Sequence, residues 1–194
     1  MERLEQQMNF LKEVDKLKTI YRQTYITGGE RKENDAEHSW HLALMVFLLS
    51  EYANEKIDVL RTMGMLLIHD IVEIDAGDTY AFDLEGGKSK VEREEKAADR
   101  LFQLLPSDQA SYIRELWDEF ELGETIEAKF ANTLDKVQPI LLHELSDGKS
   151  WREHKVTLDK ILKRNEHTAK GSKELWNYSE KVIESHIDKG NIIK

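Results

Sequence analysis

The sequence predicts an all-α fold built as a single domain. Apolar residues recur every three or four positions along most of the chain, which is the period of a helix with one buried face. Two prolines and ten glycines are few for 194 residues, whereas turn-rich β folds use more of both. A chain of this length suits one domain. We expect that domain to span residues 1–194, with its core motifs in 10–145 and the helices of 151–189 as an extension.

Composition restricts the partners and the chemistry. The chain has no cysteine, so any bound metal must be held by nitrogen and oxygen atoms. A formal net charge of −10 without a basic stripe argues against nucleic-acid binding. The N-terminus is charged and polar, and the longest apolar run, Leu42–Leu49, is far shorter than the roughly 20 residues that span a bilayer. We therefore expect a soluble, cytoplasmic protein with no nucleic-acid or membrane partner.

Three helices are expected in the first half of the chain. The apolar residues from Leu4 to Ile20 keep a helical period, which a Gly-Gly pair then breaks. Asn34, followed three residues later by Glu37, forms a capping-box pattern that opens the second helix. The three helices are thus expected over about 4–20, 34–53 and 58–74.

The second half of the chain is helical as well. Ser89 with Glu92 is another capping-box pattern, Pro106 precedes a further helix, and Thr125 is an N-cap residue. The helices are expected over about 89–105, from 107 past 120, over 125–145, over 152–164 and over 172–189.

The helix that opens at Ser107 carries an aromatic and apolar stripe. At helical spacing such a stripe is most often part of the core, and the alternative is a face for self-association. If the stripe is such a face, we expect the protein to form a homodimer. The stripe consists of Tyr112, Leu116, Trp117 and Phe120.

A polar doublet, His69–Asp70, interrupts the apolar third helix. An imidazole and a carboxylate are costly to bury unless something compensates their desolvation, and a shared divalent cation does so for both. His38 and Asp135 stand in two other apolar helical segments, and we read the four residues as one metal site. A structural bundle, in which hydrogen bonds satisfy the four side chains, is the alternative.

The spacing around the doublet adds a catalytic candidate. Adjacent helical residues differ in direction by about 100°, so His69 and Asp70 can share an ion only near a helix end or with the ion to one side. Glu73 lies four and three residues after them, on their shared face, where it could orient or deprotonate a bound water. Pro139 removes the helical hydrogen bond to the Asp135 carbonyl, and the resulting bend either aims Asp135 inward or only accommodates packing.

These motifs together resemble the HD-domain metal-dependent phosphohydrolases, and within them most closely the 5′-deoxynucleotidase branch. The resemblance rests on segments Asn34–Trp40, Ile68–Thr79 and Asn132–Lys136. It implies an all-helical fold with one divalent ion bound by His38, His69, Asp70 and Asp135.

The resemblance also implies roles around that ion. Glu73 would position or activate the attacking water, and Asp78 would lie near the substrate sugar. Arg22 is the nearest match to an arginine that lies late in the family's first helix and contacts the nucleotide. Gln23 stands where the family has an aromatic residue.

The expected activity is hydrolysis of a phosphomonoester, with a (deoxy)nucleoside 5′-monophosphate as the favoured substrate. Asp70 and Glu73 are the catalytic candidates, and manganese, cobalt, iron, nickel, zinc and magnesium all suit the ligand set. Two alternatives stay open. One is hydrolysis of another phosphorylated nucleotide such as an alarmone, and the other is a non-catalytic HD module that binds a metal or ligand.

Overall fold

The structure is a computed structural model that describes residues 2–194, apart from the side chains of Leu84 and Glu85, and it confirms the all-α class. A small antiparallel pair of strands interrupts the helices near the N-terminus. Within the described residues, no helix is both long enough and apolar enough to cross a membrane. The strands are β1 (Tyr21–Tyr25) and β2 (Lys32–Asn34), and the helices are α1 (Arg3–Val14), α2 (Asp35–Leu49), α3 (Val59–Ile68), α4 (Glu73–Ala76), α5 (Leu84–Gly87), α6 (Lys90–Phe102), α7 (Ser107–Leu122), α8 (Ile126–Leu145), α9 (Lys149–Glu153), α10 (Leu158–Arg164) and α11 (Lys173–Asp188).

The hairpin of β1 and β2 follows a first helix that is shorter than predicted. α1 ends at Val14, a 3₁₀ turn (Asp15–Thr19) follows, and the chain then becomes extended. Tyr21 pairs with Asn34 in an antiparallel register. Two glycines with φ of 83° and 73° form the turn, in a backbone region that other residues adopt rarely. The sequence analysis missed the hairpin because a three-residue strand is too short to show clear alternation.

Two of the predicted N-caps are confirmed and one is wrong. The Asn34 side chain accepts a hydrogen bond from the Glu37 amide at 2.9 Å, and the Glu37 carboxylate accepts one from the Asn34 amide at 3.2 Å. Thr125 caps α8. The Ser89 side chain does not cap α6, and its hydroxyl accepts a hydrogen bond from Arg93 at 3.3 Å.

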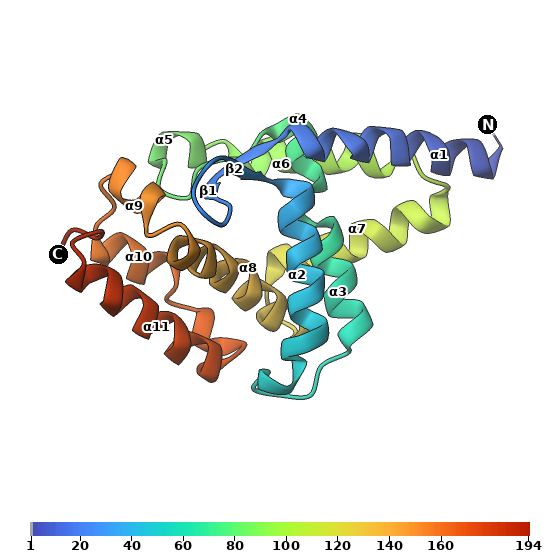
Figure 1. Ribbon diagram of the computed structural model, residues 1–194. Coiled ribbons are helices and arrows are strands. Elements are labelled where there is room, and N and C mark those ends of the chain that lie inside the picture. Colours follow the sequence, from blue (N-terminus) through green and yellow to red (C-terminus); the bar gives the residue numbers. More distant parts are fainter. Residues whose placement is uncertain (1) are drawn as a thin grey trace.

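Helix α8 lies between two groups of helices (Figure 1). On one side, α2 and α3 pack against each other and against α8, and α7 contacts both α3 and α8. On the other side, α11 packs along α8, and α9 and α10 lie near the C-terminus (Figure 1). Side chains from α8 therefore reach both halves of the molecule.

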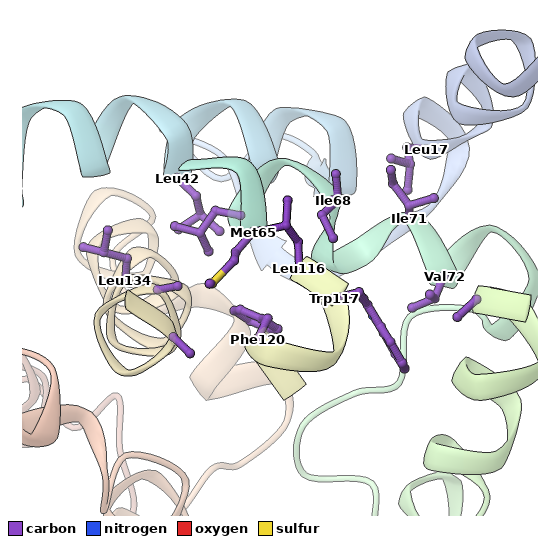
Figure 2. Packing of buried hydrophobic residues seen from close by; sticks show 14 of the residues in the cluster. Leu17, Leu42, Met65, Ile68, Ile71, Val72, Leu116, Trp117, Phe120 and Leu134 are labelled. Atoms are coloured by element: carbon purple, nitrogen blue, oxygen red, sulfur yellow. The ribbon is translucent and has the colours of Figure 1, made fainter. Parts of the chain in front are cut away.

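The main hydrophobic core fills the space between α2, α3, α7 and α8 (Figure 2). Leu42, Met65 and Leu134 come from three different helices and have no exposed surface. Trp117 and Phe120 of α7 are 3% and 6% exposed and pack into the same core. Three residues of the α7 stripe are therefore core, packed against α3, α6 and α8, whereas Tyr112 is 52% exposed. The homodimer stays a prediction.

A smaller cluster joins α8 to the C-terminal helices. Ile140 of α8, Trp151 of α9, Ile161 of α10 and Ile183 of α11 are only 2–3% exposed and pack together. Their burial holds the last fifty residues against α8. These residues therefore stand where they can contribute to a site on α8.

Candidate metal centre and pocket

His38 is held in the first turn of α2, with no exposed surface. Its Nδ1 lies 3.0 Å from Oε1 of Gln138, and the Gln138 amide in turn donates to Glu33 at 2.7 Å. An amide oxygen only accepts hydrogen bonds, so His38 carries its proton on Nδ1. Burial lowers the pKa of His38, but the Asp135 and Glu33 carboxylates outweigh it and raise that pKa to about 9, so an ion that binds Nε2 would displace a proton shared with Asp135.

The His69–Asp70 doublet lies at a helix end. α3 ends at Ile68, and a 3₁₀ turn (His69–Val72) leads into α4, so the predicted continuous helix to residue 74 is wrong. The break turns both side chains toward one point, with His69 Nε2 3.1 Å from an Asp70 carboxylate oxygen. His69 Nδ1 donates to the carbonyl of Leu66 at 2.9 Å, which directs its other nitrogen into the site.

Asp135 of α8 completes the cluster. Its Oδ1 lies 3.1 Å from Nε2 of His38 and 3.7 Å from Nε2 of His69. An Asp70 carboxylate oxygen lies 3.8 Å from Nε2 of His38. The structure thus brings together all four residues that the sequence singled out, from segments far apart in the chain.

This geometry fits a divalent cation. Donors in neighbouring positions around an ion at about 2.1 Å stand about 3 Å apart in an octahedron. The observed separations of 3.1–3.8 Å are close to that spacing. His69 Nε2 is buried and has no hydrogen-bond partner among the described residues, and it faces two carboxylates. His38, His69 and Asp135 each offer one ligand atom within 4.8 Å of the others, and Asp70 approaches His69 with Oδ1 and His38 with Oδ2. Nitrogen and oxygen donors of this kind suit several divalent metals.

Arg22 approaches the cluster from β1, which follows the first helix. Its Nη1 donates to Asp70 at 2.7 Å and to Asp35 at 3.4 Å. Burial alone raises the pKa of Asp70, but His69 and Arg22 outweigh it and hold that pKa below its ordinary value. Asp70 is therefore ionised, as a metal ligand must be.

Glu73 and Asp35 form a buried carboxyl pair beside Asp70. Glu73 begins α4 and is 5% exposed. Burial, together with the Asp70 and Asp35 carboxylates, holds the pKa of Glu73 well above its usual range. Carboxylate oxygens of Asp35, Asp70 and Glu73 lie within 4.8 Å of one another, and burial together with the Asp70 charge raises the pKa of Asp35 to about 7. The pair can therefore hold a proton near neutral pH.

A pocket of about 280 Å³ adjoins the cluster. Asp78, two residues after α4, lines it, and burial raises the pKa of that carboxyl. Trp151 of α9 and Arg164 of α10 form part of the wall, so the C-terminal helices belong to the site. His143 lines the pocket as well, although it takes no part in the four-residue cluster, and its ring stacks on Trp151 at 4.0 Å.

Four residues of this site were missed by the sequence analysis. Two of them offered a signal, because Asp35 and Gln138 each lie three residues from a candidate ligand on the same helix face. The other two lie on the hairpin and on a C-terminal helix, and only the tertiary fold brings them to the site. The four residues are Glu33, Asp35, Gln138 and Arg164.

Known proteins share this sequence in part. Human 5′-deoxynucleotidase HDDC2 is 31% identical over 135 residues, which cover 69% of this chain and 65% of the human protein. Its counterpart from Bos taurus is 33% identical over 135 residues, covering 69% of this chain and 64% of the bovine protein. The chain therefore spans slightly less than two thirds of the length of these curated relatives.

A solved structure matches nearly the whole chain. The crystal structure of a "predicted metal-dependent phosphohydrolase" from Magnetospirillum magnetotacticum MS-1 is 49% identical, with a TM-score of 0.94 over 99% of this chain and 96% of that one. A conserved hypothetical protein from Pyrococcus furiosus is 25% identical, with a TM-score of 0.61 over 93% of this chain and 99% of that one. The HD domain family model matches residues 14–176, a range that holds all four clustered residues. With two histidines and two aspartates gathered at the end of α3 and on α2 and α8, the chain belongs to the HD domain family.

Proposed function

We propose that this chain is a metal-dependent phosphohydrolase that removes the phosphate group from a nucleoside 5′-monophosphate, with deoxynucleotides favoured. The observation that carries the proposal is the convergence of two imidazoles and two carboxylates beside a pocket of about 280 Å³. The similarity to human 5′-deoxynucleotidase HDDC2 and to the Magnetospirillum phosphohydrolase supports the reaction class and the substrate class.

The metal would be held by the four clustered residues, of which Asp70 also belongs to the catalytic machinery. A bound divalent cation polarises a phosphate oxygen and lowers the pKa of a bound water. Manganese, cobalt, iron, nickel, zinc and magnesium all accept nitrogen and oxygen donors of this kind, so the donor set does not select one metal. The proposed ligands are His38, His69, Asp70 and Asp135.

Glu73 would orient the attacking water and donate a proton to the leaving group. Its side chain lines the pocket beside the carboxylates of Asp35 and Asp70, which places a carboxyl group where it can orient the attacking water. Attack on phosphorus breaks the ester P–O bond, and the departing alkoxide needs a proton. Because its pKa is raised, Glu73 can supply that proton near neutral pH.

Arg22 and Asp78 would contact the substrate. Both line the pocket, and the Arg22 guanidinium carries positive charge beside the proposed ligand Asp70. The Asp78 carboxylate can accept a hydrogen bond from a sugar hydroxyl. Gln23 lines the same pocket, so a polar side chain would face the substrate where the family has an aromatic one.

A phosphate-release assay on a panel of 5′-nucleotides, with each divalent ion added in turn, tests the proposal. We expect release by the metal-loaded wild type and none after chelation. Asp70→Ala should lose both metal and turnover, whereas Glu73→Gln should keep the metal and lose turnover by about a hundredfold or more. Glu92→Gln is the matched control, since Glu92 is exposed on α6.

Two results would count against this assignment. Unchanged turnover in Glu73→Gln removes its role, and failure of the metal-loaded protein to release phosphate from any nucleotide removes the nucleotidase function. Release of pyrophosphate from an alarmone in the same panel would favour the alarmone alternative. Nucleotide binding without any release would favour a non-catalytic HD module.

We also propose that two copies of the chain associate through α2. Four large apolar side chains on α2 are between 40% and 67% exposed and lie at positions i, i+4, i+7 and i+8, which places them on one face. An exposed apolar face of this kind is typical of a protein interface. Light scattering on Phe47→Asp tests it, and a wild type that is already monomeric contradicts it. The face consists of Trp40, Leu44, Phe47 and Leu48.

A further inference from the structure

The four Arg and Lys side chains that line the pocket fall into two classes. Arg22 lies 2.7 Å from Asp70, and Lys90 lies 3.4 Å from Glu94, so each has a carboxylate partner. Lys136 and Arg164 have none within the ion-pair distance of 4.0 Å among the described side chains. In a chain with a formal net charge of −10, two pocket cations without a carboxylate partner call for an explanation.

Arg164 is directed into the pocket by the end of α10. Ile161, one turn earlier, is 2% exposed and anchors the helix in the smaller core. Asn165, the next residue, donates to the Ile161 carbonyl at 2.9 Å and accepts a hydrogen bond from Thr168 at 3.2 Å. Ile161 and Asn165, on either side of Arg164 in the sequence, are therefore held in place, which keeps Arg164 in the wall of the pocket.

The position of Arg164 costs free energy unless an anion compensates it. Burial lowers the pKa of the guanidinium, and the Asp135 and Asp78 carboxylates only partly offset that effect. A half-buried guanidinium that forms no close ion pair lacks part of the compensation that protein charges usually receive on burial. A ligand with negative charge would supply it.

Lys136 lines the same pocket as Arg164 and is likewise half-buried. It follows Asp135 directly on α8 and has no carboxylate partner within 4.0 Å among the described side chains. Two cations in the wall of one pocket, neither paired with a carboxylate, favour an anion bound by both. An arginine fork and a lysine point charge are the two donors that proteins commonly combine around a phosphate group.

We propose that Arg164 and Lys136 bind the phosphate group of the substrate, on the side of the metal site that faces α10. The proposed phosphate site and the metal site adjoin at Asp135. Its carboxylate lies 3.1 Å from His38, and Lys136 follows it directly in the chain. Arg22, which is engaged by Asp70 and Asp35, mainly balances the carboxylates of the cluster. This inference rests on the proposed phosphohydrolase function, because it names the group that the pocket cations hold.

Calorimetric titration of the metal-loaded protein with inorganic phosphate tests the inference directly. Arg164→Gln and Lys136→Gln should each weaken phosphate binding by about tenfold, and KM for a 5′-nucleotide should rise by a similar factor. Arg164→Lys should restore part of the affinity, and metal affinity should stay unchanged in all three variants. Lys163→Gln is the matched control, because Lys163 is an exposed neighbour on the same helix.

The outcomes separate this inference from the proposed function. Unchanged phosphate affinity and KM in a folded Arg164→Gln protein overturn the inference, even if the wild type hydrolyses nucleotides. Phosphate binding that depends on Arg164, in a protein that hydrolyses no phosphomonoester, supports the anion site and overturns only the function. If Arg164→Gln fails to fold, Arg164→Lys and Lys136→Gln decide by the same two measurements.

Discussion

Arg22 donates a hydrogen bond of 2.7 Å to Asp70, so a cation from the hairpin is paired with a proposed metal ligand at the end of α3. The guanidinium keeps its charge at every ordinary pH. It therefore stabilises the ionised carboxylates of the cluster and at the same time repels a divalent cation that shares them. Arg22 should therefore stabilise the cluster when no metal is bound and weaken the binding of a metal to it.

Replacing Arg22 by methionine should make the protein more dependent on metal. The variant loses the charge that balances Asp70 and Asp35, so its metal-free form should melt at a lower temperature than the wild type. Its metal affinity should rise by about tenfold, because the repulsion is gone, and the increase in Tm on metal addition should be larger.

Thermal melts with and without a saturating divalent ion measure this difference. Arg31→Met serves as the control, since Arg31 is an exposed arginine that pairs with Glu37 outside the pocket. Equal metal-induced increases in Tm for Arg22→Met and the wild type would show that Arg22 and the ion do not compete for the same carboxylates.

Replacing Gln138 by leucine should weaken metal binding without removing a proposed ligand. Gln138 accepts from Nδ1 of His38 and donates to Glu33, and both contacts hold the imidazole in the tautomer that presents Nε2. Loss of such a supporting contact typically lowers metal affinity by about 10–100-fold. Competition with a chelating dye measures the affinity, and Gln103→Leu, on the exposed end of α6, is the control. An unchanged affinity would mean that packing alone orients His38.

Helix positions were largely predictable because their signals are local. The Asn34 cap and the Thr125 cap lie where their residue types indicate, and the apolar period marks the long helices. The break at Ile68 was not predictable in the same way, since the apolar run continues across it and only the fold decides where the helix ends. The hairpin was missed for a related reason, because its strands are short and are defined by pairing between distant residues.

The candidate site was predictable where polar side chains occur in a segment whose other residues are apolar and expected to be buried. His69 and Asp70 stood out because an apolar helix has no reason to hold them unless they bind something. Arg164 gave no such signal, since a charged residue on a short amphipathic helix normally faces solvent. The division into core motifs and a C-terminal extension remains a prediction, and α9 and α10 line the pocket in the structure.

His143 should make stability depend on pH. Burial, together with the charges of His186 of α11 and Arg164 of α10, lowers the pKa of His143 to about 3, so the folded protein keeps this imidazole neutral. The unfolded chain binds a proton there below about pH 6.5, which the folded protein does not do until about pH 3. The stabilisation is therefore complete above about pH 6.5 and is lost as the pH falls toward 3, by up to about 1.4 kcal/mol per pH unit.

Urea unfolding at pH 7 and pH 4.5 measures that loss. His143→Phe keeps an aromatic ring against Trp151 and removes the titrating group, so its free energy of unfolding should fall less between the two pH values than that of the wild type. His167→Gln, at an exposed position, should follow the wild type. A variant with the wild-type pH dependence would show that the loss comes from other groups.

Gly171 lies where the chain between α10 and α11 approaches the backbone of α8. A Cβ at this position would overlap the carbonyl oxygen of Lys129 and the hydroxyl of Thr133. The φ of Gly171 is −91°, which alanine adopts freely, so the cost of Gly171→Ala is one of space and not of backbone conformation. We expect a loss of about 1–3 kcal/mol in the free energy of unfolding.

Gly87→Ala is the control, because a Cβ there meets nothing within 4 Å, and it should be neutral or slightly stabilising. Equal stability of the two variants would mean that the C-terminal helices do not pack this closely on α8. The part of the pocket wall that carries Arg164 would then be held less firmly than the structure indicates.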